Sequence, residues 1–104
     1  MCLHDLIVDE LIKNKSLAAL IYLIDKGREL ELTINSQDYF ISRDKAQKYV
    51  SLWEGKNEQS FESTERLIEN AIILNDSFLH YWNSVQIKAL FWYIRNTIAY
   101  DYSF

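Results

Sequence analysis

The stretch GRELELTI, residues 27–34, decides the fold because its apolar and polar residues alternate. Leu30, Leu32 and Ile34 fall on one face of an extended chain, and the two glutamates and the threonine fall on the other. A period of two residues is typical of a strand that is buried on one face only. The stretch therefore predicts a β-strand whose leucine and isoleucine face belongs to the core.

Two further strand-like runs follow this stretch, at residues 38–43 and 47–53. Turn-forming residues at 35–38 and 44–46 join the three runs, and the turn-rich segment EGKN at 54–57 is predicted to end the meander. The expected sheet is therefore antiparallel, with three strands and a possible fourth from the end of the chain.

The second face of this predicted sheet is aromatic. Alternation places Phe40, Tyr49 and Trp53 there, pointing away from the aliphatic core face. Exposed aromatic area is costly in water, so these side chains need either a covering layer or a partner. We therefore expect function to be located on this face.

One or two helices are predicted before the sheet. Apolar residues at helical spacing predict the first over residues 3–13. Ser16 suits the N-cap of a second helix over residues 17–26, which Gly27 ends in a left-handed conformation. An alternative stays open here, because residues 20–24 also suit a strand that a tight turn joins to the next one.

Two short helices are predicted after the meander. Ser63 caps the first, which runs through Asn70, and Ser77 caps the second, which runs through Asn83. The side chains expected to pack inward are Leu67, Ile68, Ala71 and Ile72 around the first helix and Phe78, Leu79 and Trp82 in the second.

The end of the chain supports two interpretations. Residues 85–89 alternate like an edge strand that returns to the sheet, whereas residues 87–100 also fit an amphipathic helix. Aromatic residues are concentrated in this segment: Phe91, Trp92, Tyr93, Tyr100, Tyr102 and Phe104. We expect this aromatic tail to cover the second face of the sheet, or else to contact another molecule.

Composition fits one small α+β domain over residues 1–104, with 49% hydrophobic and 25% charged residues. The longest apolar run, residues 17–24, is too short to cross a membrane, and no signal peptide is expected at the start. A single cysteine excludes an intrachain disulfide and favours the cytoplasm. The net charge of −4, without a cluster of basic residues, disfavours direct nucleic-acid binding.

The segments GRELEL at 27–32 and YFIS at 39–42 resemble strands of small uncharacterised α+β proteins from low-GC Gram-positive bacteria and their mobile elements. In that group a capped "F-x-S" helix, a short "L-x-x-x-W" helix and a final strand follow. FES at 61–63 and residues 79–85 fit this outline, so the resemblance extends over residues 26–91. It implies a bacterial or phage cytosol and no assigned activity, and the aromatic tail departs from it.

Candidate catalytic residues are few. Cys2, His4 and His80 are the only thiol and imidazole side chains, and no paired spacing typical of a zinc site joins them to a carboxylate such as Asp5. The two glycines stand alone, so no phosphate-binding loop exists. The sequence thus predicts no metal site and no cofactor, and it favours a non-enzymatic protein without deciding the point.

Two functions from different classes remain. The first is a protein-interaction module, acting by homodimerisation or by binding or inhibiting another bacterial protein; its predicted contact residues are Phe40, Tyr49, Trp53, Trp92, Tyr93, Tyr100 and Tyr102. The alternative is a phage-type acidic regulator that mimics nucleic acid and inhibits a nucleic-acid enzyme. Its candidate residues recur every three or four positions, as if on one helical face: Glu58, Glu62, Glu65 and Glu69. A solvated helix face explains the same spacing.

Overall fold

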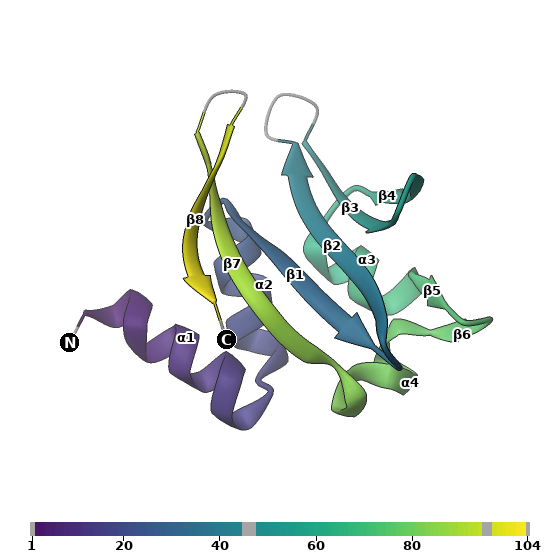
Figure 1. Cartoon of the computed structure of the whole chain (residues 1–104), viewed down its shortest axis with the longest axis horizontal. Helices are drawn as coiled ribbons and strands as arrows, with labels where there is room; N and C mark the ends of the chain where they lie inside the picture. The colour runs from purple at the N-terminus through teal and green to yellow at the C-terminus, as the bar shows by residue number, and fades with distance from the viewer. Residues whose placement is uncertain (1, 45–47, 95–96, 104) are drawn as a thin grey trace.

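The described residues fold into two layers, with four α-helices packed on one face of a six-stranded antiparallel sheet (Figure 1). A computed structural model describes residues 2–44, 48–94 and 97–103, of which residues 92–94 and 97–103 are described by their backbone alone. The strand order is β4-β3-β2-β1-β7-β8. The predicted α+β class is therefore confirmed, although the sheet is larger than expected.

The helical interpretation of the N-terminal segment is confirmed. Helix α1 spans Leu3–Asn14 and helix α2 spans Leu17–Asp25, where the alternative placed a strand. The Ser16 hydroxyl accepts a hydrogen bond from the Ala19 N–H at 3.1 Å, which satisfies a donor that the first turn leaves free. Gly27 ends α2 with φ +98°, a conformation that glycine adopts without a Cβ clash.

The predicted meander is also confirmed. It consists of strands β1 (Arg28–Ile34), β2 (Gln37–Asp44) and β3 (Tyr49–Glu54). Asn35 and Ser36 form the turn between β1 and β2, both with positive φ, as a two-residue hairpin requires. The predicted start of the third strand, residue 47, lies outside the described residues.

The predicted end of the meander is wrong. Residues 54–57 form a hairpin turn, and strand β4 (Asn57–Phe61) pairs with β3 so that Glu58 lies opposite Trp53. Gly55 adopts φ +57° and provides the left-handed residue that the turn needs. EGKN is therefore a connection within the sheet rather than its boundary.

Three short elements follow β4 before the chain returns to the sheet. Helix α3 (Thr64–Asn70) begins at Ser63, whose hydroxyl accepts a hydrogen bond from the Arg66 N–H at 3.1 Å. A small unpredicted hairpin, β5 (Ile72–Ile73) and β6 (Asp76–Ser77), separates α3 from the single-turn helix α4 (Phe78–Tyr81) and the 3-10 turn η1 (Trp82–Ser84). Ser77 caps α4 as predicted, since it accepts from the His80 N–H at 3.1 Å.

Two of the side chains predicted to pack inward are exposed. Ile72 is 53% exposed because α3 ends two residues earlier, so helical spacing does not apply to it. Leu79 is 45% exposed because Phe78 and Trp82, whose ring centroids lie 5.7 Å apart, occupy the inner side of this single turn. The other predicted inward residues of these two helices are buried.

The aromatic tail lies in the sheet and not across it. Strand β7 (Gln86–Ile94) pairs with β1 on one side and with β8 (Thr97–Ser103) on the other. The predicted edge strand is therefore an inner strand, and the helical alternative for residues 87–100 is wrong. The β8 backbone lies beside β7 and extends the sheet, so it forms no separate layer over the second face (Figure 1). The expectation that the aromatic side chains of this tail cover that face falls on side chains outside the described part of the structure.

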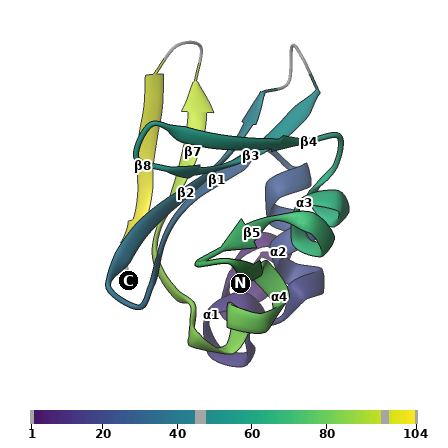
Figure 2. The same cartoon turned by 90° about the vertical axis from the view of Figure 1, so that its right-hand side faces the viewer.

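The core lies between the sheet and the helices. Leu30, Leu32 and Ile34 of β1 are fully buried, which confirms the face predicted from GRELELTI. Helices α1 to α4 all lie on this side (Figure 2). Their fully buried contributions include Leu11, Leu20, Leu23, Ile24, Leu67 and Phe78. Burial of this aliphatic area is the main source of stability in a domain of this size.

Candidate functional site

The face of the sheet opposite the helices carries no covering layer in residues 2–44, 48–94 and 97–103, since no described helix or strand crosses it (Figures 1 and 2). We call it the open face. The strand register assigns to it Glu29, Glu31 and Thr33 of β1; Asp38, Phe40, Ser42 and Asp44 of β2; Tyr49, Ser51 and Trp53 of β3; Glu58 and Ser60 of β4; and Ala89 and Phe91 of β7.

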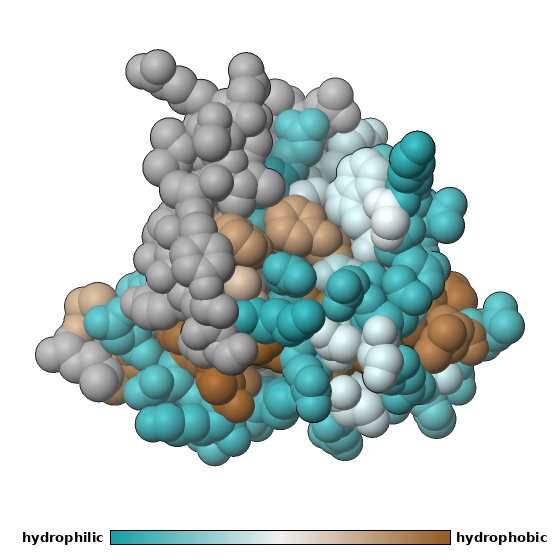
Figure 3. Space-filling model, in the orientation of Figure 1, coloured by the Kyte–Doolittle hydropathy of each residue, from teal (hydrophilic) through white to brown (hydrophobic). Residues whose placement is uncertain are grey.

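Aromatic side chains lie at the centre of the open face. Phe40 and Trp53 are direct cross-strand neighbours, and the Phe40 ring also contacts that of Phe91, with the centroids 6.0 Å apart. The Trp53 indole N–H donates to the Ser42 hydroxyl at 3.0 Å, which fixes the orientation of the ring. Figure 3 shows light brown and white surface on this face, bordered by hydrophilic surface below and on the right. Tyr49, at the far end of β3, is 45% exposed.

A hollow of about 250 Å³ opens on this face, lined by Glu31, Asp38, Tyr39, Phe40, Trp53 and Gly55. The Asp38 carboxylate lies 3.6 Å from the Lys88 ammonium and 3.5 Å from the Thr33 hydroxyl. The Glu31 carboxylate has no hydrogen bond or ion pair with any described residue. The hollow therefore combines two aromatic rings with one paired and one unpaired carboxylate.

Glu29 lies on the same face but is 3% exposed, although its alternating position predicted contact with solvent. One carboxylate oxygen accepts a hydrogen bond from the Arg43 N–H at 3.0 Å, and the other has no hydrogen-bond partner among the described residues. Burial raises the pKa of this carboxyl above its usual value, and the hydrogen bond from Arg43 opposes that rise only in part. The open face thus contains a buried carboxyl group with a hydrogen bond to only one of its two oxygens.

Arg28, the neighbour of Glu29, points to the helix side and is fully buried. Its Nε donates to the Phe91 carbonyl at 3.2 Å, and its Nη1 contacts Nε2 of His4 on α1. Arg28 therefore ties the start of β1 to β7 and to α1, while Glu29 ties it to β2. Sequence reasoning did not select either residue, because their burial depends on strands far away in the chain.

The four acidic residues predicted to share a helical face do not share one. Glu58 lies on β4, where its carboxylate accepts from the Ser51 and Ser60 hydroxyls at 2.6 and 2.9 Å. Glu62 precedes α3, and only Glu65 and Glu69 belong to that helix. The spacing misled because it runs across the end of a strand and the start of a helix.

The predicted aromatic contact residues likewise belong to different parts of the structure. Phe40, Tyr49 and Trp53 share the open face, as expected from alternation. Trp92 and Tyr93 lie in β7, and Tyr100 and Tyr102 lie in β8, where their side chains are outside the described part of the structure. By register, Tyr100 pairs with Phe91 and Tyr102 pairs with Leu90.

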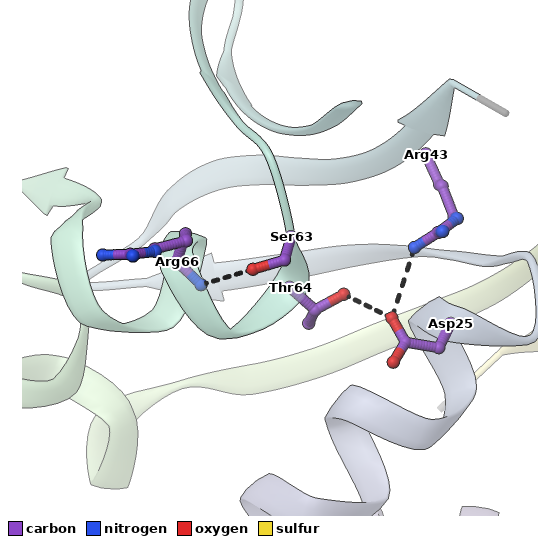
Figure 4. A network of polar contacts seen from close by, with 5 residues as sticks. All are labelled: Asp25, Arg43, Ser63, Thr64 and Arg66. Atoms are coloured by element: carbon purple, nitrogen blue, oxygen red, sulfur yellow. Dashed lines mark hydrogen bonds and ion pairs between the residues drawn. The ribbon is translucent and has the colours of Figure 1, made fainter. Parts of the chain in front are cut away.

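A second polar cluster lies on the helix side and has a structural role (Figure 4). The Asp25 carboxylate, at the end of α2, accepts from the Arg43 guanidinium at 3.2 Å and from the Thr64 hydroxyl at 2.9 Å. These contacts connect α2, β2 and α3. The side chain of Arg66 points away from Asp25, so the cluster does not gather positive charge.

The groups considered for catalysis are scattered. Cys2 is exposed, His4 lies against Arg28, and His80 is an exposed residue 3.6 Å from Asp76. No group of three potential ligand side chains is arranged around a metal position in the part of the chain that the structure describes. A larger hollow, of about 580 Å³, lies beside β4 and α3 and is lined by Tyr49, Ser60, Phe61, Glu62, Arg66 and Asn70.

Glu31 and Asp38 are the site residues that the sequence interpretation missed. The signal was present, because alternation along β1 and β2 places both acids on the same side as Phe40. It could not show that the strands are paired so that acids and rings surround one hollow.

Comparisons of the chain with protein-family models, with curated proteins and with solved structures find no match. Among the described helices, none is both long and apolar enough to span a bilayer.

Proposed function

We propose that this protein is a non-enzymatic interaction module that binds another protein through the open face of its sheet. The observation that carries the proposal is an aromatic cluster, Phe40, Trp53 and Phe91, on a face that no described element covers. Tryptophan and other large aromatic side chains dominate the energy of protein interfaces because they bury much area in few conformations. Rigid sheet strands also hold them in place before binding.

Charge favours a different protein over a second copy as the partner. The residues of β1 to β4 that face this side carry five carboxyl groups: Glu29, Glu31, Asp38, Asp44 and Glu58. The ammonium of Lys88 pairs with the Asp38 carboxylate at 3.6 Å. Two such faces repel each other on approach, so homodimerisation through this face is unfavourable. A partner with the opposite charge is favoured.

The acidic-mimic alternative receives less support. A mimic of a phosphate backbone needs a continuous row of exposed acids, whereas Glu58 lies on β4, where one of its carboxylate oxygens accepts from the Ser51 and Ser60 hydroxyls. Glu65 and Glu69 remain exposed on α3, where a solvated helix surface explains them.

The test compares two matched variants in capture from cells that express the protein, followed by reconstitution with the captured protein once purified. Phe40→Ser combined with Trp53→Ser removes the aromatic cluster, whereas Ile72→Ser removes an exposed apolar side chain from the β5–β6 hairpin. We expect the double variant to raise the Kd of the purified complex by at least about tenfold and Ile72→Ser to leave it unchanged.

Both variants must first show the circular dichroism spectrum and cooperative unfolding of the parent. A purified complex whose Kd is insensitive to the double variant overturns the proposal. The same conclusion follows if the purified parent binds none of the captured proteins.

A further inference from the structure

The hollow on the open face has the chemistry of a site for a positively charged group. Phe40 and Trp53 form its aromatic walls, and the carboxyl groups of Glu31 and Asp38 lie at its side. Aromatic faces carry the negative part of a quadrupole, so they attract a cation that sits over them. Carboxylates add full negative charge in the same place, and the described residues that line the hollow include no cationic side chain.

The chain's own Lys88 shows that a cation is attracted to the rim. Its ammonium lies 3.6 Å from the Asp38 carboxylate, and both side chains are about half exposed or more, at 49% and 67%. An exposed ion pair of this kind contributes little to stability, so an incoming cation replaces it at small cost. Glu31, without an ion pair among the described residues, is available from the start.

A third carboxyl group, that of Glu29, lies two residues from Glu31 on the same face, about 7 Å along a strand. Burial raises its pKa and so favours its neutral form, which leaves Glu31 and Asp38 as the carboxylates that attract a cation here.

The volume limits the occupant to a single side chain. At about 250 Å³, the hollow is smaller than the roughly 300–1,000 Å³ typical of sites that enclose a whole small ligand. It is also open to solvent and continuous with the aromatic cluster, since Phe40 belongs to both. A side chain that projects from a bound protein fits these dimensions better than a free metabolite.

We infer that this hollow receives an arginine or lysine side chain of the partner protein, with its cationic group over Phe40 and Trp53 and paired with Glu31 and Asp38. The inference rests on the proposed function and specifies the chemistry of the partner. The partner is a protein whose contact surface is basic around an apolar centre, complementary to the open face.

The direct test uses small probes and no partner. N-acetyl-arginine methylamide and N-acetyl-lysine methylamide are titrated into the 15N-labelled protein at low salt, and N-acetyl-norleucine methylamide serves as an uncharged probe of similar length. We expect the cationic probes to shift the amide signals of Glu31 and Phe40 and the indole signal of Trp53. Added salt weakens these shifts because the contact is electrostatic.

One variant and its matched control test whether the Glu31 carboxylate binds the cationic probe. Glu31→Gln is expected to raise the Kd of the arginine probe by about threefold to tenfold. Glu69→Gln removes the same charge from the exposed surface of α3 and is expected to leave the Kd unchanged. Equal shifts from the norleucine probe, shifts located elsewhere, or a Kd insensitive to Glu31→Gln would each overturn the inference.

The partner complex separates this inference from the proposed function. If Phe40→Ser with Trp53→Ser disrupts the complex while Glu31→Gln and added salt do not, the open face is the interface but the hollow receives no cation. If neither variant affects the complex, both proposals fail. Loss of affinity in both variants, with the salt dependence, supports both.

Discussion

The two faces of strand β1 show how this molecule places a packed surface and an uncovered surface on the same strand. Along β1, Leu30, Leu32 and Ile34 are fully buried under the helices, while Glu31 and Thr33, on the intervening positions, remain partly exposed on the open face. Neighbours in sequence thus lie in opposite environments. Packing against four helices restricts which side chains fit on the covered face. No described helix or strand places such a restriction on the open face.

The difference between the two faces predicts which substitutions the fold tolerates. A core side chain contacts many neighbours that cannot rearrange fully, so its removal leaves a cavity. A partly exposed side chain of the open face, such as Thr33, contacts fewer neighbours, so its substitution mainly changes the chemistry of the surface. Effects on stability and on binding should therefore separate between alternate residues of the same strand.

The largest expected effect comes from a substitution on the covered face. Leu32→Ala should lower the free energy of unfolding by about 2–5 kcal/mol, because Leu32 is fully buried and the cavity cannot close completely. Thr33→Ala, one residue further, should change it by less than about 1 kcal/mol. Urea unfolding monitored by circular dichroism measures both values, and similar losses in the two variants would contradict the division between faces.

Much of the covered face could be predicted from the sequence because its signals are local. Ser16, Ser63 and Ser77 each cap the helix that follows, and each does so through a hydrogen bond to the N–H three residues later. The alternation of residues 28–34 also depends only on strand geometry. Such features are determined by neighbours in sequence and do not require knowledge of the tertiary fold.

Errors arose where a local pattern had two solutions. Ile87, Leu90 and Ile94 fit one helical arc, yet they lie in β7, where pairing with β1 and β8 outweighs helix propensity. Similarly, the spacing of acids from Glu58 to Glu69 suggested one helical face, although Glu58 lies on β4 and only Glu65 and Glu69 lie on α3. In both cases the decisive hydrogen bonds are made by strands that the local pattern does not contain.

Part of the candidate site could be predicted because it depends on local alternation along single strands. Alternation alone located Phe40, Tyr49 and Trp53 on one face, and the register of β2 and β3 bears this out. The hollow depends on Glu31 and Asp38 meeting Trp53 across three strands, and the burial of Glu29 depends on the approach of β7. Non-local arrangements of this kind require the structure.

Glu29 lies where the two environments meet and should show an intermediate effect. Its pKa is raised in the folded state, so its stabilising contribution is complete below the unfolded value, near 4.5, and is lost as the pH rises through the folded value. Glu29→Gln cannot ionise and still accepts from the Arg43 N–H. The variant should therefore be more stable than the parent at neutral pH, by about 1.4 kcal/mol for each unit of raised pKa.

This stabilisation should disappear when unfolding is measured below pH 4.5, since the parent carboxyl is then protonated in both states. Glu69→Gln provides the baseline for losing one exposed carboxylate. A destabilised Glu29→Gln at neutral pH would instead show that the negative charge itself holds β1 to β2. In that case the unpartnered oxygen would not represent a cost of burial.

The smallest effect on stability is expected at Lys88, where the effect on recognition should be favourable. Lys88→Gln removes an exposed ion pair with Asp38 and should change the free energy of unfolding by no more than about 0.5 kcal/mol. The same change frees the Asp38 carboxylate for an incoming cation and should lower the Kd of the arginine probe by about twofold to fivefold. Urea unfolding and the amide titration, performed on one preparation, measure the two quantities together. A variant that binds the probe more weakly would mean that Lys88 helps to form the hollow, and the open face would then resemble the covered face in depending on its own internal contacts.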